Sequence, residues 1–342
     1  MSGLRIAVVG ATGAVGREMW KLLEASRIPV ATIHAYSSAR SAGTSLMFRG
    51  AAVTCRELCD ATFTPVDLTL ASAGAAASRL WSPRFAAAGA LVVDNSSAFR
   101  AEPDCAMVIP EVNGEELERR VSIFAVPNCS TIQMVVALAP LHRAWGLRAV
   151  RVATYQSASG AGGRAMAELE RGARAVLSGD EEEPELFPHP LAFNLIPQIG
   201  NFDAAGDTVE ERKMRDETRR LLGLPELPLS ATCVRVPVLR GHSEAVWASF
   251  TESPEPEAAR RLLAESGVVV EDDGARGIYP MPRRAAGCRE VFAGRIRRDE
   301  ADPLGLTLWV VADNLLKGAA GNAFEIAEAL LARGRVRAGA PA

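Results

Sequence analysis

A cysteine stands where the chain is predicted to change from strand to helix. The apolar run of residues 121–126 stops at the sequence Pro127-Asn128-Cys129-Ser130-Thr131. From Ile132 onward the apolar residues recur at roughly helical spacing, so Cys129 is expected in the first turn of a helix. Backbone N–H groups and the helix dipole favour a thiolate there, which makes Cys129 a candidate nucleophile. The alternative is a small buried apolar residue.

One histidine is a candidate acid/base group. The sequence Gly241-His242-Ser243-Glu244 is expected to place His242 on a loop before a strand at residues 245–250. Histidine is the usual proton donor and acceptor at neutral pH. His34, in a predicted strand, and His142, in a predicted helix, are interpreted as structural.

A glycine-rich turn follows the first predicted strand. Residues 4–9 are apolar, and Gly10-Ala11-Thr12-Gly13-Ala14-Val15-Gly16 leads into a helix predicted at residues 14–26. Glycines let the backbone approach a pyrophosphate, whose charge then lies at the helix N-terminus. The spacing is G-x-x-G-x-x-G instead of G-x-G-x-x-G, and a plain glycine-rich turn is the alternative.

The end of the next predicted strand indicates which dinucleotide would bind. After residues 32–36 the chain reads Ser37-Ser38-Ala39-Arg40-Ser41, where an NAD enzyme would offer an acidic residue to the ribose. An arginine among hydroxyl groups favours a 2′-phosphate, and therefore NADP, with Ser38, Arg40 and Ser41 as its ligands. The alternative is a solvated loop.

Two more strands, at residues 66–71 and 91–94, are predicted to end in small or polar residues. These are Ser72 and Gly74 after the first, and Asn95 after the second. Such strand ends line the ligand crevice of an open α/β sheet. Arg100 follows closely and could hold an anion, or it could be an ordinary surface charge.

The pattern changes to longer strands after residue 148, as expected for a second, sheet-rich domain. The strand at residues 150–156 ends in Gln156 and is expected to lead through a flexible loop at 157–163 into a helix at 164–177. In the predicted strand at 230–238, Arg235 shares one face with Cys233 and could be solvated or could bind a carboxylate.

A helix is predicted at residues 209–222. Glu210, Lys213, Met214 and Glu217 recur at i, i+3, i+4 and i+7, which places them on one face. Taken alone, this pattern favours a solvent-exposed ladder of ion pairs.

Composition sets the class of protein. The chain has 342 residues, 48% of them hydrophobic and 23% charged, which suits a two-domain globular protein. A net charge of −3 gives no reason to expect nucleic acid or an anionic membrane as a partner. No signal peptide or membrane span is recognised, so a cytoplasmic location is expected. The six dispersed cysteines predict neither disulfides nor a metal site.

The motifs together strongly resemble bacterial-type aspartate-β-semialdehyde dehydrogenase over about residues 4–330. They are Gly10-x-x-Gly13-x-x-Gly16, Ser96-Ser97-Ala98-Phe99-Arg100, Pro127-Asn128-Cys129-Ser130-Thr131, Tyr155-Gln156-Ser157, Glu210-Glu211-x-Lys213-Met214, Arg235-Val236-Pro237 and Gly241-His242-Ser243-Glu244. The resemblance implies an α/β fold with a Rossmann-like NADP-binding domain at 1–128 plus 318–342. An α+β catalytic and dimerisation domain, like the C-terminal domain of glyceraldehyde-3-phosphate dehydrogenase, is implied at 129–317.

The resemblance also implies the roles of individual residues. Cys129 would be the nucleophile, His242 its acid/base partner, and Gln156 the group that positions the thiohemiacetal. Asn128 would assist at the substrate phosphate or oxyanion. The remaining substrate ligands would be Arg235 for the α-carboxylate, Glu210 for the α-amino group, and Arg100 and Lys213 for the phosphate. The implied NADP ligands are Gly10, Thr12, Gly13, Ala14, Val15, Gly16, Ser38, Arg40, Ser41, Ser72, Gly74, Asn95, Ser159, Gly160 and Asn314.

The implied reaction is the reversible reductive dephosphorylation of aspartyl phosphate to aspartate semialdehyde through a cysteine thioester, with NADPH as reductant and release of phosphate. It serves the biosynthesis of lysine and diaminopimelate, methionine, threonine and isoleucine. A homodimer, or a tetramer made of two dimers, is implied.

The chain departs from the common family pattern at two places. Leu316 stands where arginine is common, which puts cofactor or interdomain contacts in doubt, and Gln156-Ser157-Ala158-Ser159 replaces Gln-Ala-Val-Ser. One alternative enzyme is N-acetyl-γ-glutamyl-phosphate reductase, whose nucleophile usually follows Pro-Gly and whose acylated substrate does not need Glu210. Another alternative is a non-catalytic NADP-binding protein, against which the intact Cys129, His242 and Gln156 argue.

Overall fold

A computed structural model describes residues 3–181 and 183–336, and the chain divides into two compact units. The first unit comprises Met1–Pro127 and Ala319–Ala342, and the second comprises Asn128–Gly318. The chain therefore enters the second unit directly before Cys129 and leaves it after Gly318.

The first unit is built on a parallel sheet with the strand order β5-β2-β1-β6-β7-β9-β8. Its strands are β1 (Leu4–Val9), β2 (Val30–Ser37), β5 (Arg56–Glu57), β6 (Leu68–Ala71), β7 (Leu91–Asp94), β8 (Ala106–Met107) and β9 (Ile123–Ala125), and a separate hairpin joins β3 (Ser45–Phe48) to β4 (Ala51–Thr54). Strands β1 and β6 are almost wholly buried, which explains their unbroken apolar sequences.

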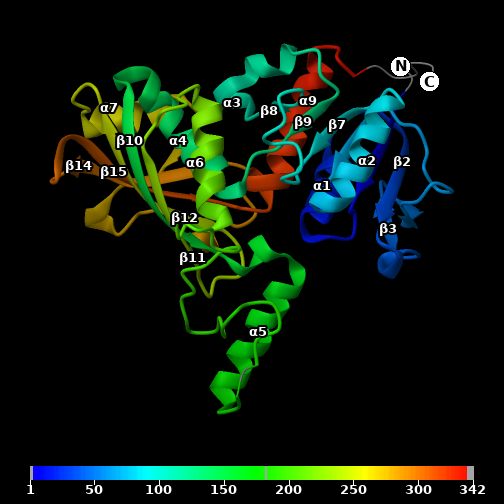
Figure 1. Cartoon of the computed structure of the whole chain (residues 1–342), viewed down its shortest axis with the longest axis horizontal. Coiled ribbons are helices and arrows are strands. Elements are labelled where there is room, and N and C mark those ends of the chain that lie inside the picture. Colours follow the sequence, from blue (N-terminus) through cyan, green and yellow to red (C-terminus); the bar gives the residue numbers. More distant parts are fainter. Residues whose placement is uncertain (1–2, 182, 337–342) are drawn as a thin grey trace. The chain divides into compact units, whose positions relative to one another are not determined.

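Helices cover both faces of this sheet (Figure 1). They are α1 (Ala14–Ala25), α2 (Ala75–Ala87), α3 (Pro110–Asn113) and α9 (Gly321–Ala332), with short 3₁₀ helices at Ala39–Ser41 and Gly114–Glu118. The connection through α1 leads from β1 to β2, whereas the connection through α2 leads the opposite way along the sheet, from β6 to β7. Because such crossovers are right-handed, α1 and α2 lie on opposite faces, and the order reverses between β1 and β6. Ligands bind at this kind of reversal.

The second unit contains a mixed sheet with the order β11-β10-β12-β15-β14-β13. Its strands are β10 (Leu147–Gln156), β11 (Leu229–Arg235), β12 (His242–Phe250), β13 (Val269–Val270), β14 (Val291–Asp299) and β15 (Asp302–Ala312). The pairs β10–β12, β12–β15 and β14–β15 are antiparallel, while β10–β11 and β13–β14 are parallel. The structure and the comparisons described below confirm the expected fold class.

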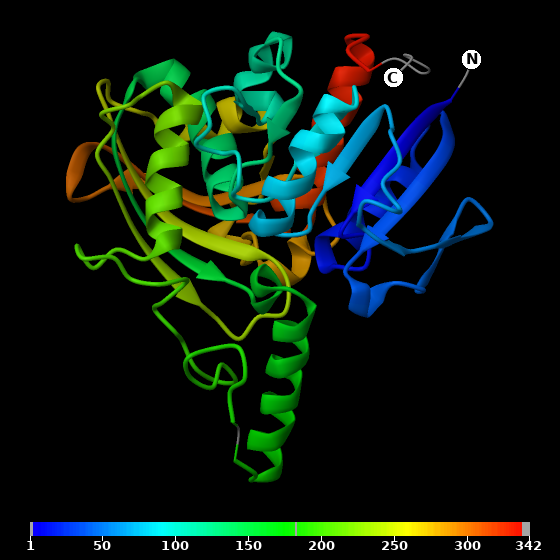
Figure 2. The same ribbon diagram turned by 45° about the vertical axis from the view of Figure 1, so that its right-hand side comes forward.

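Most helices of the second unit lie on one face of this sheet, but the shortest, Pro282–Ala285, packs against the opposite face beside Val311 and Trp309. The helices of this unit are α4 (Cys129–Trp145), α5 (Gly163–Ser178), α6 (Val209–Leu222), α7 (Pro256–Glu265) and α8 (Pro282–Ala285), with 3₁₀ helices at Ala158–Ala161 and Gly274–Arg276 and a π-helix at Leu316–Ala320. Helix α4 packs on β10, β12, α6 and α7, whereas α5 extends away from the sheet (Figures 1 and 2). The opposite face of the sheet exposes Tyr155 and Trp247, each 37% accessible.

The local predictions compare well with these elements, with two exceptions. The helices expected at 14–26, 164–177 and 209–222 are present within one residue at each end. The expected flexible loop at 157–163 is wrong: its centre is a 3₁₀ helix, and Ser157 and Ser159 are buried. The loop expected at His242 is also wrong, because His242 is the first residue of β12.

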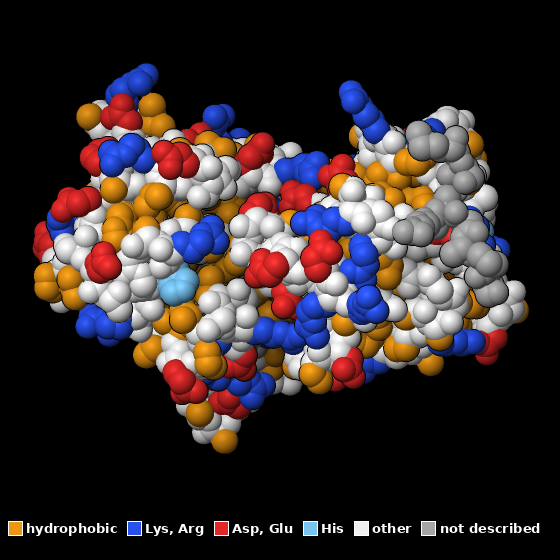
Figure 3. Space-filling model, turned by 90° about the horizontal axis from the view of Figure 1, so that it is seen from above, with side chains coloured by type: hydrophobic (Ala, Val, Ile, Leu, Met, Phe, Trp, Pro, Cys, Tyr) orange, Lys and Arg blue, Asp and Glu red, His pale blue; other side chains and the backbone are white. Residues whose placement is uncertain are grey.

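Charged side chains of both signs are mixed on the face shown in Figure 3. Within the described residues, no helix is long and apolar enough to cross a membrane.

Candidate active site

Cys129 is the first residue of α4, as the sequence predicts. Asn128 is the N-cap but makes no capping bond with its side chain, so the first N–H groups of the helix keep their positive field at the thiol. Cys129 Sγ lies 3.7 Å from Asn128 Oδ1, and the residue is partly exposed. A side chain at Gly318 would bring its Cβ to 2.8 Å from the Cβ of Cys129, so only glycine fits beside the thiol.

Glu210 contacts three other expected site residues. Its Oε1 accepts hydrogen bonds from Asn128 Nδ2 (2.9 Å) and Gln156 Nε2 (3.1 Å), and its Oε2 lies 3.3 Å from Lys213 Nζ. Burial by itself raises the pKa of this carboxyl, but the charge of Lys213 and the hydrogen bonds from the two amides lower the pKa overall. Glu210 is therefore a buried carboxylate that keeps its charge.

The solvent-exposed ladder expected on α6 is wrong. Glu210, Met214 and Glu217 are 5%, 0% and 6% exposed, because this face packs toward α4 and β11. Helical periodicity identifies residues that share a face, but it does not say whether that face meets solvent.

Two glutamates of α6 have structural ties that the sequence reasoning missed. Glu217 Oε2 accepts a hydrogen bond from the backbone N of Asn128 at 2.6 Å. Glu211 closes a capping box with Thr208, and its Oε1 accepts from the backbone N of Cys233 at 2.9 Å. The Thr208-x-x-Glu211 spacing was a signal for the capping box, whereas nothing in the sequence indicated the partner of Glu217.

Arg235 is the last residue of β11 and is only 6% exposed. The solvated interpretation of this arginine is therefore wrong. Its Nη1 donates to the carbonyl of Ser157 at 2.6 Å, and burial lowers its pKa. A Cβ at Gly160 would lie 2.8 Å from this Nη1 and 3.2 Å from His242 Nε2, so a larger residue would crowd both groups.

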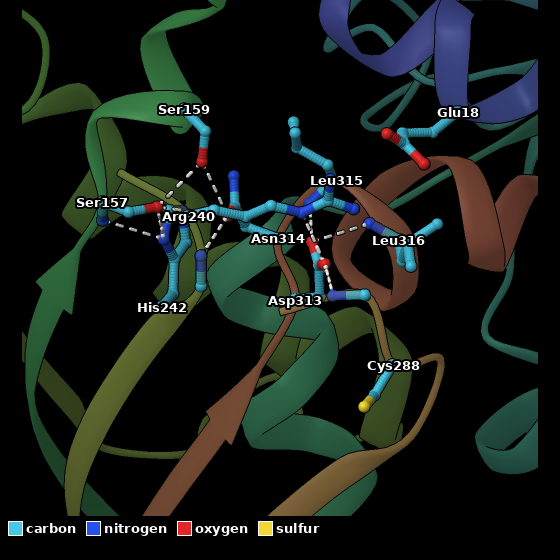
Figure 4. A network of polar contacts seen from close by, with 12 residues as sticks. Glu18, Ser157, Ser159, Arg240, His242, Cys288, Asp313, Asn314, Leu315 and Leu316 are labelled. Atoms are coloured by element: carbon cyan, nitrogen blue, oxygen red, sulfur yellow. Dashed lines mark hydrogen bonds and ion pairs between the residues drawn. The ribbon is translucent and has the colours of Figure 1, made fainter. Parts of the chain in front are cut away.

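His242 is fully buried, and its two ring nitrogens have different surroundings (Figure 4). Nδ1 lies 3.0 Å from the backbone N of Ser157 and 3.1 Å from its Oγ. Nε2 has no hydrogen-bond partner among the described residues. Burial, and then the charge of Arg235, lower the pKa of His242 to about 3, so the imidazole is neutral at physiological pH.

Asn314 and Ser159, expected as NADP ligands, lie in the polar network around His242. Asn314 Oδ1 accepts hydrogen bonds from Ser159 Oγ (2.9 Å), Ser157 Oγ (3.1 Å) and the backbone N of Gly241 (3.0 Å). The neighbouring Asp313 pairs with Arg240 and accepts hydrogen bonds from the backbone N atoms of Leu315 and Leu316. Leu316, which stands where arginine is common in the family, is thus the first residue of the π-helix, and its backbone N–H donates to Asp313.

One buried acid, Glu244, and one buried thiol, Cys233, also lie near the site. Burial raises the pKa of Glu244, which follows His242 by two residues and therefore points to the same face of β12. Burial, and then the charge of Glu210, raise the pKa of the Cys233 thiol. Cys233 is thus a protonated, structural cysteine, unlike Cys129.

The glycine-rich turn of the first unit fits a dinucleotide. Gly10 has a φ of +83°, and a Cβ there would lie 2.4 Å from the carbonyl of Ser72. A Cβ at Gly16 would lie 2.0 Å from the carbonyl of Gly10. Gly13 is the N-cap of α1 without a capping side chain, and the first turn, which contains Ala14 and Val15, has no acidic residue. The helix N-terminus is therefore open to an anion.

The other expected cofactor ligands of the first unit also lie at strand ends. Ser38 and Arg40 are exposed after β2, with Ser41 closing the same 3₁₀ turn. Arg40 makes no hydrogen bond or ion pair with a described residue. Ser72 and Gly74 follow β6, and Asn95, after β7, has an Oδ1 atom that is buried without a partner in the described chain. These groups suit the ribose and phosphate oxygens of a dinucleotide.

Arg100 belongs to the first unit, whereas the other expected substrate ligands belong to the second. Its Nε donates to the carbonyl of Val126 at 2.9 Å and its Nη2 to that of Asn95 at 3.1 Å. These bonds fix the guanidinium beside the ends of β7 and β9. Among the described residues, all six cysteines are free and no group of three or more acidic, histidine or cysteine ligands could hold a metal.

Comparisons with known proteins agree with this arrangement. Residues 5–120 match the family "Semialdehyde dehydrogenase, NAD binding domain", and residues 138–317 match "Semialdehyde dehydrogenase, dimerisation domain". The chain is 46% identical to aspartate-semialdehyde dehydrogenase of Bacillus subtilis (strain 168) over 337 residues, which cover 96% of this chain and 97% of the relative.

Solved structures show the same similarity. Aspartate semialdehyde dehydrogenase II of Vibrio cholerae, complexed with ASA, superposes with a TM-score of 0.93 at 40% identity, covering 97% of this chain and 99% of that one. The enzyme of Candida albicans, solved with NADP, has a TM-score of 0.75 at 26% identity, covering 97% and 99%. The resemblance seen in the sequence motifs is confirmed, and the chain belongs to the aspartate-semialdehyde dehydrogenase family of oxidoreductases.

Proposed function

We propose that this chain catalyses the reversible, NADPH-dependent conversion of aspartyl phosphate to aspartate semialdehyde and phosphate, with Cys129 as the nucleophile. The observation that carries the proposal is the Glu210 cluster next to Cys129. There a charged, buried carboxylate accepts hydrogen bonds from Asn128 and Gln156 and pairs with Lys213. An amino acid with a side-chain phosphate offers the complementary ammonium, carboxylate and phosphate groups.

The chemistry begins at Cys129. Its thiolate attacks the side-chain carbonyl carbon of aspartyl phosphate, the C–S bond forms, and the C–O bond to phosphate breaks to leave a thioester. NADPH, when bound, supplies the hydride that reduces this thioester. His242 provides a proton to the developing oxyanion and takes it back when the C–S bond breaks and the aldehyde leaves. Gln156 and Asn128 position the oxygen that carries the developing charge.

The substrate ligands follow from the same charges. Arg235 binds the α-carboxylate, because a planar guanidinium can form two parallel hydrogen bonds to it. Glu210 binds the α-ammonium group. Lys213 and Arg100 are the proposed phosphate ligands.

NADP is the proposed cofactor, in preference to NAD. The N-terminus of α1 suits the pyrophosphate, and Arg40 is exposed and available for a 2′-phosphate. The relative from Candida albicans was solved with NADP. Ser159, Gly160 and Asn314 are the proposed contacts from the second unit. The contacts of Ser159 and Asn314 with the network around His242 are compatible with a nicotinamide ring bound near that residue.

The proposed assembly is a homodimer formed through the second unit. The match to a dimerisation domain at residues 138–317 supports it, as does the part of the sheet face on which Tyr155 and Trp247 are exposed. We further propose a cytoplasmic enzyme of lysine, diaminopimelate, methionine, threonine and isoleucine biosynthesis.

The decisive assay is the reverse reaction. Purified protein should reduce NADP when given both aspartate semialdehyde and phosphate, and omission of phosphate should abolish the rate. The same assay with NAD tests the cofactor, and Cys129→Ala should be inactive. Activity with N-acetylglutamate semialdehyde but not with aspartate semialdehyde would assign the chain to the acylated substrate instead.

A further inference from the structure

Glu244 is a buried acid whose two side-chain oxygens have no hydrogen-bond partner among the described residues. It is 0% exposed, and both Oε1 and Oε2 lack a partner. Gln133 on α4 is 1% exposed, and its Oε1 and Nε2 lack a partner as well. The two side chains are neighbours, since the amide of Gln133 acts on the Glu244 carboxyl as a hydrogen-bonding group. Two adjacent buried side chains thus carry four polar atoms whose bonding must be accounted for.

A protonated Glu244 satisfies all four atoms at once. The hydroxyl of a carboxylic acid donates to the amide oxygen Oε1 of Gln133, and the amide Nε2 donates to the other carboxyl oxygen, which gives two parallel hydrogen bonds. An ionised carboxylate has no proton to donate. It would leave the amide oxygen of Gln133 unpaired beside a negative charge.

The charges around Glu244 also favour the protonated form. Burial raises the pKa of its carboxyl, the amide of Gln133 opposes this effect, and the negative charge of Glu210 on α6 adds to it. The nearby cations have other partners: Lys213 pairs with Glu210, and Arg235 donates to a backbone carbonyl. The other groups that adjoin Glu244 are uncharged, namely Cys233 on β11, Thr154 on β10, Val310 on β15 and His242 on β12 itself.

We propose that Glu244 and Gln133 form a buried acid–amide pair that holds α4 against β12 and thereby fixes the spacing between Cys129 and His242. Gln133 lies one helical turn after Cys129, and Glu244 lies two residues after His242 on the same face of its strand. The pair therefore joins the elements that carry the nucleophile and the acid/base group, close to both groups. Glu244 and Gln133 are positioning residues, and this role rests on the proposed function.

Infrared spectroscopy of the purified protein near neutral pH tests the pair. The difference spectrum between the parent protein and Glu244→Gln should contain the carbonyl stretching band of a protonated carboxyl, which is separate from the bands of carboxylates. In Gln133→Met this band should persist at a higher frequency, because the carbonyl has lost its N–H donor.

Glu168→Gln is the matched control for the infrared measurement. Glu168 is also buried, but its oxygens accept hydrogen bonds from the backbone N–H groups of residues 185–187. The difference spectrum between the parent protein and Glu168→Gln should therefore lack the band.

Steady-state kinetics test the positioning role. Glu244→Met and Gln133→Met should each lower kcat for aspartate semialdehyde about tenfold with little change in KM, since the reacting groups shift while the substrate ligands remain. Glu244→Gln should keep most of kcat, because an amide can form the same two hydrogen bonds with Gln133.

Each measurement has an outcome that contradicts the inference. If the spectrum of Glu244→Gln showed no loss of a protonated carboxyl, or if Gln133→Met left the band unshifted, the pair would not exist. Full kcat in both methionine variants, or an equal loss in Glu244→Met and Glu244→Gln, would overturn the positioning role. The infrared result does not depend on turnover, so a protein that shows the pair but does not oxidise aspartate semialdehyde would contradict the proposed function alone.

Discussion

The carboxylate of Glu217 accepts a hydrogen bond from the backbone N–H of Asn128, 2.6 Å away, and thereby ties α6 to the residue that precedes the nucleophile. The two residues are 89 positions apart in the sequence. Both are buried, so this N–H has no solvent to replace its partner.

Truncation of Glu217 should therefore disturb both folding and catalysis. Glu217→Ala should destabilise the protein by about 1.5–3 kcal/mol, the usual worth of a hydrogen bond to a charged group, and should lower kcat by about tenfold to a hundredfold through misplacement of Asn128 and Cys129. Glu217→Gln keeps a hydrogen-bond acceptor, so it should lose less stability and less kcat than Glu217→Ala. Urea unfolding and steady-state kinetics would measure both effects, with the exposed Glu226→Ala as control. Equal behaviour of the Ala variants at 217 and 226 would contradict this role.

Cys129 should be the first of the six thiols to react with iodoacetamide near neutral pH. It is partly exposed and begins a helix, which favours the thiolate. Cys233 should react last, because burial raises its pKa. Peptide mass spectrometry after partial alkylation measures the order, and aspartate semialdehyde should protect Cys129. Early modification of Cys59 or Cys288 with activity retained after Cys129 is blocked would remove the nucleophile assignment.

Arg40→Ala should weaken NADP binding by about 1.5–3 kcal/mol and leave NAD binding almost unchanged, since only NADP carries the 2′-phosphate. Titration of protein fluorescence with each dinucleotide would give the two affinities. Arg120→Ala is the matched control, because Arg120 is also an exposed arginine of the first unit. An equal loss for both dinucleotides at position 40 would show that Arg40 does not recognise the 2′-phosphate.

Arg235→Lys should raise KM for aspartate semialdehyde more than it lowers kcat. Lysine keeps the charge but cannot form the paired hydrogen bonds of a guanidinium to a carboxylate, and that carboxylate lies away from the reacting carbon. His242→Asn should show the reverse pattern, with a loss of about 10²–10⁴ in kcat and a modest change in KM. Steady-state kinetics on the two variants in parallel measure both effects. If Arg235→Lys lowered mainly kcat and His242→Asn raised mainly KM, the roles assigned to the two residues would be wrong.

His242 should also make stability depend on pH. Its pKa falls from 6.5 to about 3 on folding, so below pH 6.5 the unfolded chain binds a proton that the folded chain does not. Stability therefore falls as pH decreases from about 6.5 toward 3, and this group alone should account for about 2 kcal/mol between pH 7 and 5. Denaturant unfolding at the two pH values should show that His242→Asn loses correspondingly less stability than the parent protein. The stability of His189→Asn, a change at an exposed histidine, should depend on pH as that of the parent protein does. If the stability of His242→Asn changed with pH as much as that of the parent protein, the assignment would be refuted.

Local sequence determined the features that depend on neighbouring residues. The buried strand β1, the glycine turn from Gly10 to Gly16 and the helix that begins at Cys129 were all predictable, because apolar periodicity and glycine sterics act within about a dozen residues. The motif set also identified the family, since its order and spacing extend along nearly the whole chain.

The tertiary structure alone decided which side chains meet and which faces are buried. The face of α6 with Glu210 and Glu217 has the same periodicity whether it meets solvent or protein, and only its packing against α4 and β11 makes it a buried carboxylate cluster. The local sequence predicts a loop at His242, whereas the pairing of β12 with β10 and β15 makes His242 part of the sheet. Ser157 contacts His242, which is 85 positions away in the sequence, and Asn314, which is 157 positions away. Such contacts depend on strand pairing and helix packing across the whole second unit, and no local pattern in the sequence carries that information.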